Sequence, residues 1–109
     1  MLYGRGVMKM MNLPTGSVGA VSEMLAAAAL LKNGYSVFRA ISQACYCDLI
    51  AIKGNEEWHI EVRTGYRSLN GTLNFPKHIR GKVNLLCICD RNTFEIHYLT
   101  LDMVPVELH

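Results

Sequence analysis

Three acidic side chains fall in segments where metal-dependent cleavage of a phosphodiester would need them. Asp48 directly precedes an apolar run. Glu61 lies in the next segment, where apolar and polar residues alternate, and Arg63 follows it by two residues. Glu23 lies upstream, in a segment with helical spacing. Carboxylate oxygens are the ligands that Mg²⁺ prefers, and a bound cation polarises a phosphate and activates water. The candidate catalytic residues are therefore Glu23, Asp48, Glu61 and Arg63.

Asp48 is the most informative of the three acids. Cys47 precedes it and the apolar residues 49–52 follow it, so its side chain is predicted to be buried. Burying a carboxylate that has no partner costs considerable free energy. We therefore expect Asp48 to have either a partner or a metal.

A hairpin would bring Asp48 and Glu61 together. Residues 46–53 and 58–64 are predicted strands, joined by a turn around residues 54–57. Counting outward from that turn gives similar distances to the two acids, and strand alternation lets both point to the same face.

The expected metal is Mg²⁺ or Mn²⁺, held by Asp48 and Glu61. The backbone carbonyl of Val62 could add a third ligand, and Glu23 could reach the same ion directly or through water. Arg63, predicted on the same face as Glu61, would place a fixed positive charge on the phosphate in the transition state.

Each acid also has a purely structural interpretation. A glutamate in a helix, such as Glu23, is usually solvated, and an aspartate in a strand can simply bond a turn. Glu61 and Arg63 could form a surface ion pair worth well under ~1 kcal/mol.

The surrounding sequence predicts an α/β fold, in which an N-terminal helix packs on a mixed, mostly antiparallel sheet. Residues 17–33 have helical spacing, with Thr15 and Ser17 as capping hydroxyls and Gly34 just past the end. Small side chains at residues 26–29 would let the sheet approach the helix closely. Strands are predicted at residues 35–40, 46–53, 58–64, 72–75, 83–90 and 94–101.

Two of these strands have predicted faces. Residues 46–53 are largely apolar and are predicted to be buried on both faces. In residues 58–64, alternation puts Trp58, Ile60, Val62 and Thr64 on one face and His59, Glu61 and Arg63 on the other.

Composition fits one globular domain. The chain has 109 residues, of which 50% are hydrophobic and 18% charged, and residues 1–14 read as an N-terminal extension of a domain covering 1–109. No apolar run approaches the roughly 20 residues that span a bilayer. The N-terminus lacks the pattern of a secretory signal. We expect a cytoplasmic protein with no membrane association.

Basic residues are unevenly distributed, although the net charge is only +2. From Arg63 to Arg91, six bases accompany the single acid Asp90. A basic region beside a carboxylate cluster suits DNA, although a solvated polar surface would look the same. The predicted DNA-binding residues are Arg67, Lys77, Arg80 and Lys82.

The four cysteines form two C-x-C pairs, Cys45 with Cys47 and Cys87 with Cys89. They could bind zinc if the two pairs lay on adjacent strands with converging thiols. Zinc knuckles usually space their ligands by two to four residues in a turn, whereas residues two apart in a strand share a face, as buried thiols do. Reduced, buried thiols are therefore the favoured interpretation.

Four short motifs, taken in their order along the chain, resemble the PD-(D/E)XK nuclease superfamily. Within it they resemble the small endonucleases and archaeal Holliday junction resolvase-like proteins. The matching segments are Gly16-Ser-Val-Gly19 leading to Glu23, the run LLKNGYSVF at 30–38, Cys47-Asp48-Leu-Ile-Ala and His59-Ile-Glu61-Val-Arg63-Thr64. The resemblance covers about residues 16–75 and continues more weakly beyond. It implies a restriction-endonuclease-like core and makes Glu23, Asp48 and Glu61 the acidic residues of a metal site in a DNA endonuclease.

Arg63 departs from this family, which usually has lysine at that position. Lysine can lose its proton and assist an attacking water, whereas arginine, with a pKa above ~12, cannot. Two functions remain open: a metal-dependent DNA endonuclease in which Arg63 acts electrostatically, or a catalytically weak or inactive nuclease-like domain that binds DNA or a partner protein. An exposed sheet face and apolar edge also predict a homodimer.

Overall fold

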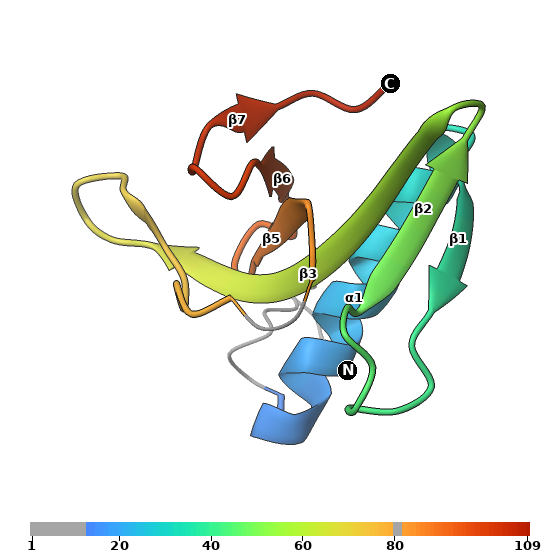
Figure 1. Cartoon of the computed structure of the whole chain (residues 1–109). Coiled ribbons are helices and arrows are strands. Elements are labelled where there is room, and N and C mark those ends of the chain that lie inside the picture. The colour runs from blue at the N-terminus through green and yellow to red at the C-terminus, as the bar shows by residue number, and fades with distance from the viewer. Residues whose placement is uncertain (1–12, 80–81) are drawn as a thin grey trace.

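The computed structural model describes residues 13–79 and 82–109, in which one helix lies across one face of a sheet (Figure 1). The elements are α1 (Thr15–Lys32), β1 (Ser36–Arg39), β2 (Leu49–Lys53), β3 (Glu56–Arg67), β4 (Leu73–Asn74), β5 (Leu85–Asp90), β6 (Ile96–Leu99) and β7 (Pro105–Val106). The predicted α/β fold, a helix packed on a mixed and mostly antiparallel sheet, is confirmed. Among the described residues, no helix combines the length and the hydropathy needed to cross a bilayer.

The sheet has the strand order β1-β2-β3-β5-β6-β7, and β4 pairs with β3 beside this path. Only β3 and β5 run parallel; the other pairs are antiparallel. Lys53 pairs with Glu56, so β2 and β3 form the predicted hairpin across a turn of two residues. Gly54 has φ +59° in this turn, a conformation that glycine adopts without strain.

The helix packs through a narrow stripe of small side chains. Ser22, Ala26 and Leu30 are buried at four-residue intervals, which places them on one face of α1. Because alanine has little bulk, the helix axis lies close to the sheet, and the Ser22 and Thr64 hydroxyl oxygens are 2.5 Å apart.

The start of the helix differs from the prediction. Neither Thr15 nor Ser17 caps it; α1 begins after Pro14, whose carbonyl accepts the Ser17 N–H at 2.9 Å. Proline holds a φ close to the helical value at a position where no intrahelical N–H bond is lost, so it favours a helix start without a side-chain cap. The end is as predicted, with Gly34 at φ +88°.

The core fills the space between α1 and the sheet. From β3 it takes Ile60 and Val62, and it also includes Leu49, Ala51 and Leu85. The predicted alternation of β3 is therefore confirmed. The opposite face of the sheet, which no described helix covers and which we call the open face, carries the side chains of His59, Glu61 and Arg63, although Glu61 is buried there.

Three predicted strands need correction, and one strand was missed. The strand expected at 58–64 extends from Glu56 to Arg67. The strand expected at 46–53 begins at Leu49, and Ile50 and Ile52 are only half-buried, because no described element covers the open face there. The strand expected at 94–101 begins at Ile96, since Phe94 has φ +66°, which a strand does not accommodate. Strand β7 was not predicted.

Gly65 lies where β4 folds back onto β3. A Cβ at this position would lie 2.8 Å from the carbonyl oxygen of Asn74 and 2.9 Å from Cγ2 of Ile88. To relieve this steric clash, the β4 backbone would have to move. We expect Gly65→Ala to lower the free energy of unfolding by about 1–3 kcal/mol, measured by urea denaturation.

Gly19→Ala is the matched control, because a Cβ there meets no described atom within 4 Å and the residue lies inside α1. It should raise stability by about 0.5–1 kcal/mol. Equal stability of the two variants would contradict the close approach of β4.

Candidate active site

A cleft of about 640 Å³ opens between the first half of α1, the connection from β1 to β2 and the middle of β3. Among the side chains that line it are Glu23, Asp48, Val62 and Arg63. Glu61 does not line the cleft; it lies fully buried beside it. The structure therefore brings the predicted residues to one end of the β2–β3 hairpin but gives them different exposure.

Asp48 comes directly before β2 and is 9% exposed. Because Leu49 pairs with Ile60, Asp48 lies opposite Glu61, as the turn count predicted. Its Oδ2 accepts the backbone N–H of Val62 at 2.8 Å, and its own N–H donates to the Ile60 carbonyl at 2.9 Å. The buried carboxylate thus has the protein partner that its position requires, and this partner fixes its orientation at the cleft.

Glu61 forms an ion pair with Arg63. The Arg63 Nη2 contacts Glu61 Oε2, and their side chains are 21% and 0% exposed. The interpretation as a surface pair is therefore wrong for Glu61. Arg63 also donates to the Val62 carbonyl at 3.3 Å and to the His78 carbonyl at 3.0 Å. The guanidinium covers Glu61, so a cation that binds Glu61 competes with Arg63.

Glu23 lies on the rim of the cleft, in an ion pair with Arg39. Its Oε1 is 3.4 Å from the Arg39 Nε, and the two side chains are partly exposed. Such a pair contributes little to stability in water. Arg39 was not among the predicted site residues, although a base at the end of a predicted strand was visible in the sequence.

The donor chemistry of Asp48 and Glu61 fits a hard cation. Within residues 13–79 and 82–109, no three His, Cys, Asp or Glu side chains lie close enough together to hold a metal. Mg²⁺ commonly takes only one or two carboxylates from a protein and keeps several waters. The opposed pair therefore meets this requirement by ligand type, while the role of Glu23 stays a prediction.

The zinc interpretation is wrong for the described residues. Cys87 and Cys89 lie on β5, whereas Cys45 and Cys47 precede β2, and β3 separates these strands. Burial raises the pKa of the Cys47, Cys87 and Cys89 thiols, which keeps them protonated and poor metal ligands. These three are buried thiols, as favoured, whereas Cys45 is exposed, so the prediction is wrong for that residue.

A hydrogen-bonded chain of three side chains lies beside the acids on the open face. The Tyr46 hydroxyl is 2.9 Å from His59 Nδ1, and His59 Nε2 is 2.6 Å from a Glu57 carboxylate oxygen. Since a carboxylate only accepts, Nε2 carries a proton and a neutral imidazole accepts the Tyr46 hydroxyl at Nδ1. Sequence alternation placed His59 on the same face as Glu61 and Arg63, but Glu57 was expected in the turn and belongs to β3. The approach of Tyr46 depends on a loop and was missed.

The predicted DNA-binding residues have exposed side chains where they are described. Arg67 is 42% exposed and donates to the Gly71 carbonyl at 2.8 Å. Lys77 and Lys82 are exposed, and Lys77 Nζ lies 4.1 Å from the centre of the Phe75 ring. Arg80 lies outside the described residues. The contacts of these residues with DNA stay predictions.

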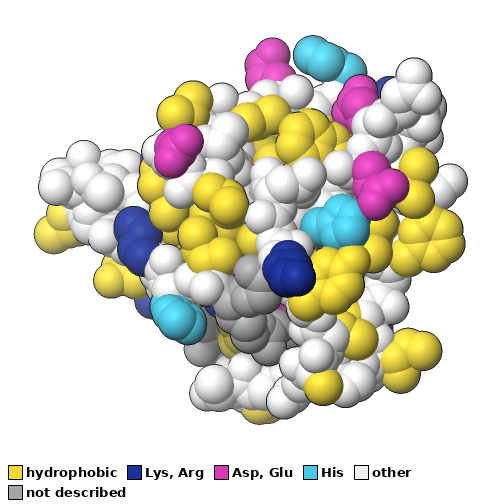
Figure 2. Space-filling model, viewed as in Figure 1, with side chains coloured by type: hydrophobic (Ala, Val, Ile, Leu, Met, Phe, Trp, Pro, Cys, Tyr) yellow, Lys and Arg dark blue, Asp and Glu magenta, His cyan; other side chains and the backbone are white. Residues whose placement is uncertain are grey.

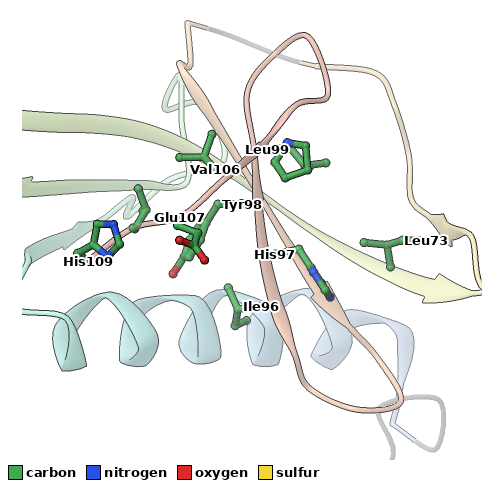
Figure 3. A pocket seen from close by; sticks show the side chains of 10 residues that line it. Leu73, Ile96, His97, Tyr98, Leu99, Val106, Glu107 and His109 are labelled. Carbon is green, nitrogen blue, oxygen red and sulfur yellow. The ribbon is translucent and has the colours of Figure 1, made fainter.

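A second pocket, of about 500 Å³, lies at the opposite edge of the sheet, beside β6 and β7 (Figure 3). Of the described residues that line it, only Glu107 is acidic. Burial raises the pKa of the Tyr98 hydroxyl, so that it stays neutral. Of the predicted acids, Glu23 and Asp48 line the cleft at the β2–β3 hairpin, and none lines this second pocket.

No protein-family model and no curated protein matches the sequence. In three dimensions the chain is similar to the solved structure of a bacterial homing endonuclease, I-Ssp6803I. The match has a TM-score of 0.68 at 14% sequence identity and covers 82% of this chain and 67% of that one. At this identity the likeness concerns the fold alone: the chain has a nuclease-like fold.

Proposed function

We propose that this chain is a divalent-metal-dependent DNA endonuclease of the PD-(D/E)XK type. The observation that carries the proposal is the placement of Asp48, directly before β2, opposite Glu61 on β3, next to a cleft that Glu23 and Arg63 also line. The nuclease-like fold supports the proposal, because the backbone is similar to that of a homing endonuclease.

Asp48 and Glu61 would hold the cation, which when bound supplies Lewis-acid polarisation of the phosphate and a more acidic water. The chain's own contribution begins with Asp48, whose carboxylate is oriented by the Val62 N–H. Arg63 can exchange Glu61 for a phosphate oxygen, because guanidinium binds both anions through the same planar donors. Its charge would then stabilise the transition state without any loss of a proton.

A second function is favoured by the buried Glu61–Arg63 pair itself. The guanidinium neutralises Glu61 and covers it, so a cation must overcome this contact before it binds. A nuclease-like domain that binds DNA, or a partner protein, without efficient cleavage would keep such a pair closed. The endonuclease requires the Glu61–Arg63 contact to break when cation and phosphate are present, whereas the binding domain keeps this contact.

Calorimetric titration with Mn²⁺, combined with cleavage of supercoiled plasmid, tests the proposed function. The wild type should release or absorb heat on binding Mn²⁺ and nick the plasmid only with Mg²⁺ or Mn²⁺. Asp48→Asn should lose both signals, because it removes the charge of one of the two expected carboxylate ligands.

Asp102→Asn is the matched control, since Asp102 is exposed in the turn between β6 and β7. It should bind and cleave as the wild type does. Mn²⁺ binding by Asp48→Asn equal to that of the wild type would exclude the shared site.

We also propose a homodimer formed through β1. This strand is one edge of the described sheet, opposite the edge at β7, and its Phe38 side chain is 56% exposed. An edge strand offers unpaired backbone groups to a second copy. Two-fold symmetry would then provide two sites for the two strands of a DNA duplex.

A further inference from the structure

The end of β3, β4 and the turn between them form an arm, residues 66–75, that projects from the body of the protein (Figure 1). Within the described sheet, β4 pairs with β3 alone, through Tyr66 with Asn74 and Arg67 with Leu73. At the outer end of the arm, Leu69 is fully exposed, with a relative accessibility of 109%.

The tip of the arm is held in one shape by its own hydrogen bonds. The Gly71 N–H donates to the Ser68 carbonyl at 2.9 Å, and the Ser68 N–H donates to the Thr72 carbonyl at 2.9 Å. The Asn70 side chain accepts the Thr72 N–H at 3.0 Å, and the Arg67 guanidinium donates to the Gly71 carbonyl at 2.8 Å. Leu69 is thus presented by an ordered turn, so little conformational entropy is lost if it is inserted elsewhere.

The charge around the arm suits a polyanion. From Val62 to Cys89 the sequence contains no acidic residue, and Asp90, at the root of the arm, is buried with its Oδ2 3.9 Å from the Arg67 Nε. Arg67 lies in the arm, Lys77 follows it, and the Arg91 guanidinium covers the Tyr66 ring at 4.8 Å. Figure 2 shows Lys or Arg side chains near the root of the arm and a hydrophobic side chain at its outer end.

We propose that this arm enters the minor groove of duplex DNA and that Leu69 wedges between neighbouring base pairs. Proteins that insert an apolar side chain in this way partly unstack one base step and bend the duplex. A single exposed leucine is common on protein surfaces. The combination of a projecting arm, an ordered tip and neighbouring basic side chains is what distinguishes Leu69 and favours DNA over a protein partner.

The proposal rests on the proposed nuclease function and adds how the duplex is held. Glu61 and Arg67 lie six residues apart on β3, roughly 20 Å at ~3.3 Å per residue. That length corresponds to about six base pairs at ~3.4 Å each. Leu69 lies two residues beyond Arg67, so the unstacked step is expected about six to eight base pairs from the cut, preferably at a flexible pyrimidine–purine step.

The test uses the full chain with duplexes that carry 2-aminopurine at successive positions, in EDTA to prevent cleavage. Anisotropy of a terminal dye reports binding, and 2-aminopurine fluorescence reports unstacking. The wild type should raise the fluorescence at one position. Leu69→Ser should abolish that rise and weaken binding by about tenfold, because the wedge no longer buries apolar surface.

Leu69→Met should keep most of the fluorescence rise, since methionine retains an apolar side chain. Leu31→Ser is the matched control: Leu31 is also exposed, at 58%, but lies on α1. It should bind DNA and unstack it as the wild type does.

The outcomes separate this proposal from the nuclease function. Binding and metal-dependent cleavage without a fluorescence rise, or with a rise that Leu69→Ser retains, would overturn the wedge and leave the nuclease standing. A rise that depends on Leu69 in a protein that never cleaves would support the wedge and reject the nuclease. Absence of any DNA binding by the wild type would overturn both proposals and would favour a protein partner for the arm.

Discussion

Glu61→Gln is expected to abolish metal-dependent DNA cleavage, lowering the rate by on the order of 10³-fold. The substitution keeps the shape of the side chain and removes the charge that would hold the cation. Glu61 is fully buried, so no neighbouring carboxylate on the surface can take its place without a change in the fold. The measurement is the initial rate of nicking of supercoiled plasmid at saturating Mg²⁺.

Loss of activity through unfolding must be separated from loss of a ligand. Glu61→Gln leaves the Arg63 guanidinium without its buried anion, although Arg63 still donates to the Val62 and His78 carbonyls. Circular dichroism and urea denaturation should show a folded protein of reduced stability. Glu61→Asp keeps the charge and should retain measurable Mn²⁺ binding. Cleavage by folded Glu61→Gln at the wild-type rate would remove Glu61 from the site.

Local patterns predicted the elements that position the acids. Spacing in α1, alternation in β3 and the Gly54–Asn55 turn were sufficient to place Asp48 opposite Glu61. These features depend on residues close together in the sequence, for which helical and strand periodicities are informative.

Features that depend on distant segments could not be predicted. Arg63 is held over Glu61 partly by the His78 carbonyl, which comes from the connection between β4 and β5. The late start of β2 has a similar origin, because the Asp48 side chain takes the Val62 N–H. Periodicity describes which face a side chain occupies, but it does not describe which loop crosses that face.

Arg63 decides between the two proposed functions. If it stabilises the transition state as a fixed cation, Arg63→Lys should retain metal-dependent cleavage, since lysine supplies a positive charge at nearly the same place. A neutral side chain should lower the rate by ~10²-fold or more, the usual cost of removing a group that stabilises developing charge. The assay is cleavage of supercoiled or branched DNA with Mg²⁺.

A second neutral variant at Arg63 is needed beside Arg63→Ala, because removing one partner of a buried ion pair lowers the free energy of unfolding by about 3–5 kcal/mol. Arg63→Ala alone leaves Glu61 buried beside an uncharged side chain, and the protein is expected to lose stability for that reason. Arg63→Gln keeps a side-chain amide that can donate to Glu61, so it should be less destabilised than Arg63→Ala. Once circular dichroism shows that it is folded, it should bind DNA and cleave it ~10²-fold more slowly than the wild type.

The opposite pattern would identify a silenced nuclease. In that case the wild type cleaves no DNA with Mg²⁺ or Mn²⁺, whereas Arg63→Lys gains activity. Lysine would achieve this because its ammonium group lacks the planar donors by which Arg63 engages Glu61 together with the Val62 and His78 carbonyls. A weaker contact would leave Glu61 accessible to a cation, and the deprotonated amine could assist the attacking water. Inactivity of wild type and Arg63→Lys alike, in folded proteins that bind DNA, would instead exclude cleavage at this site.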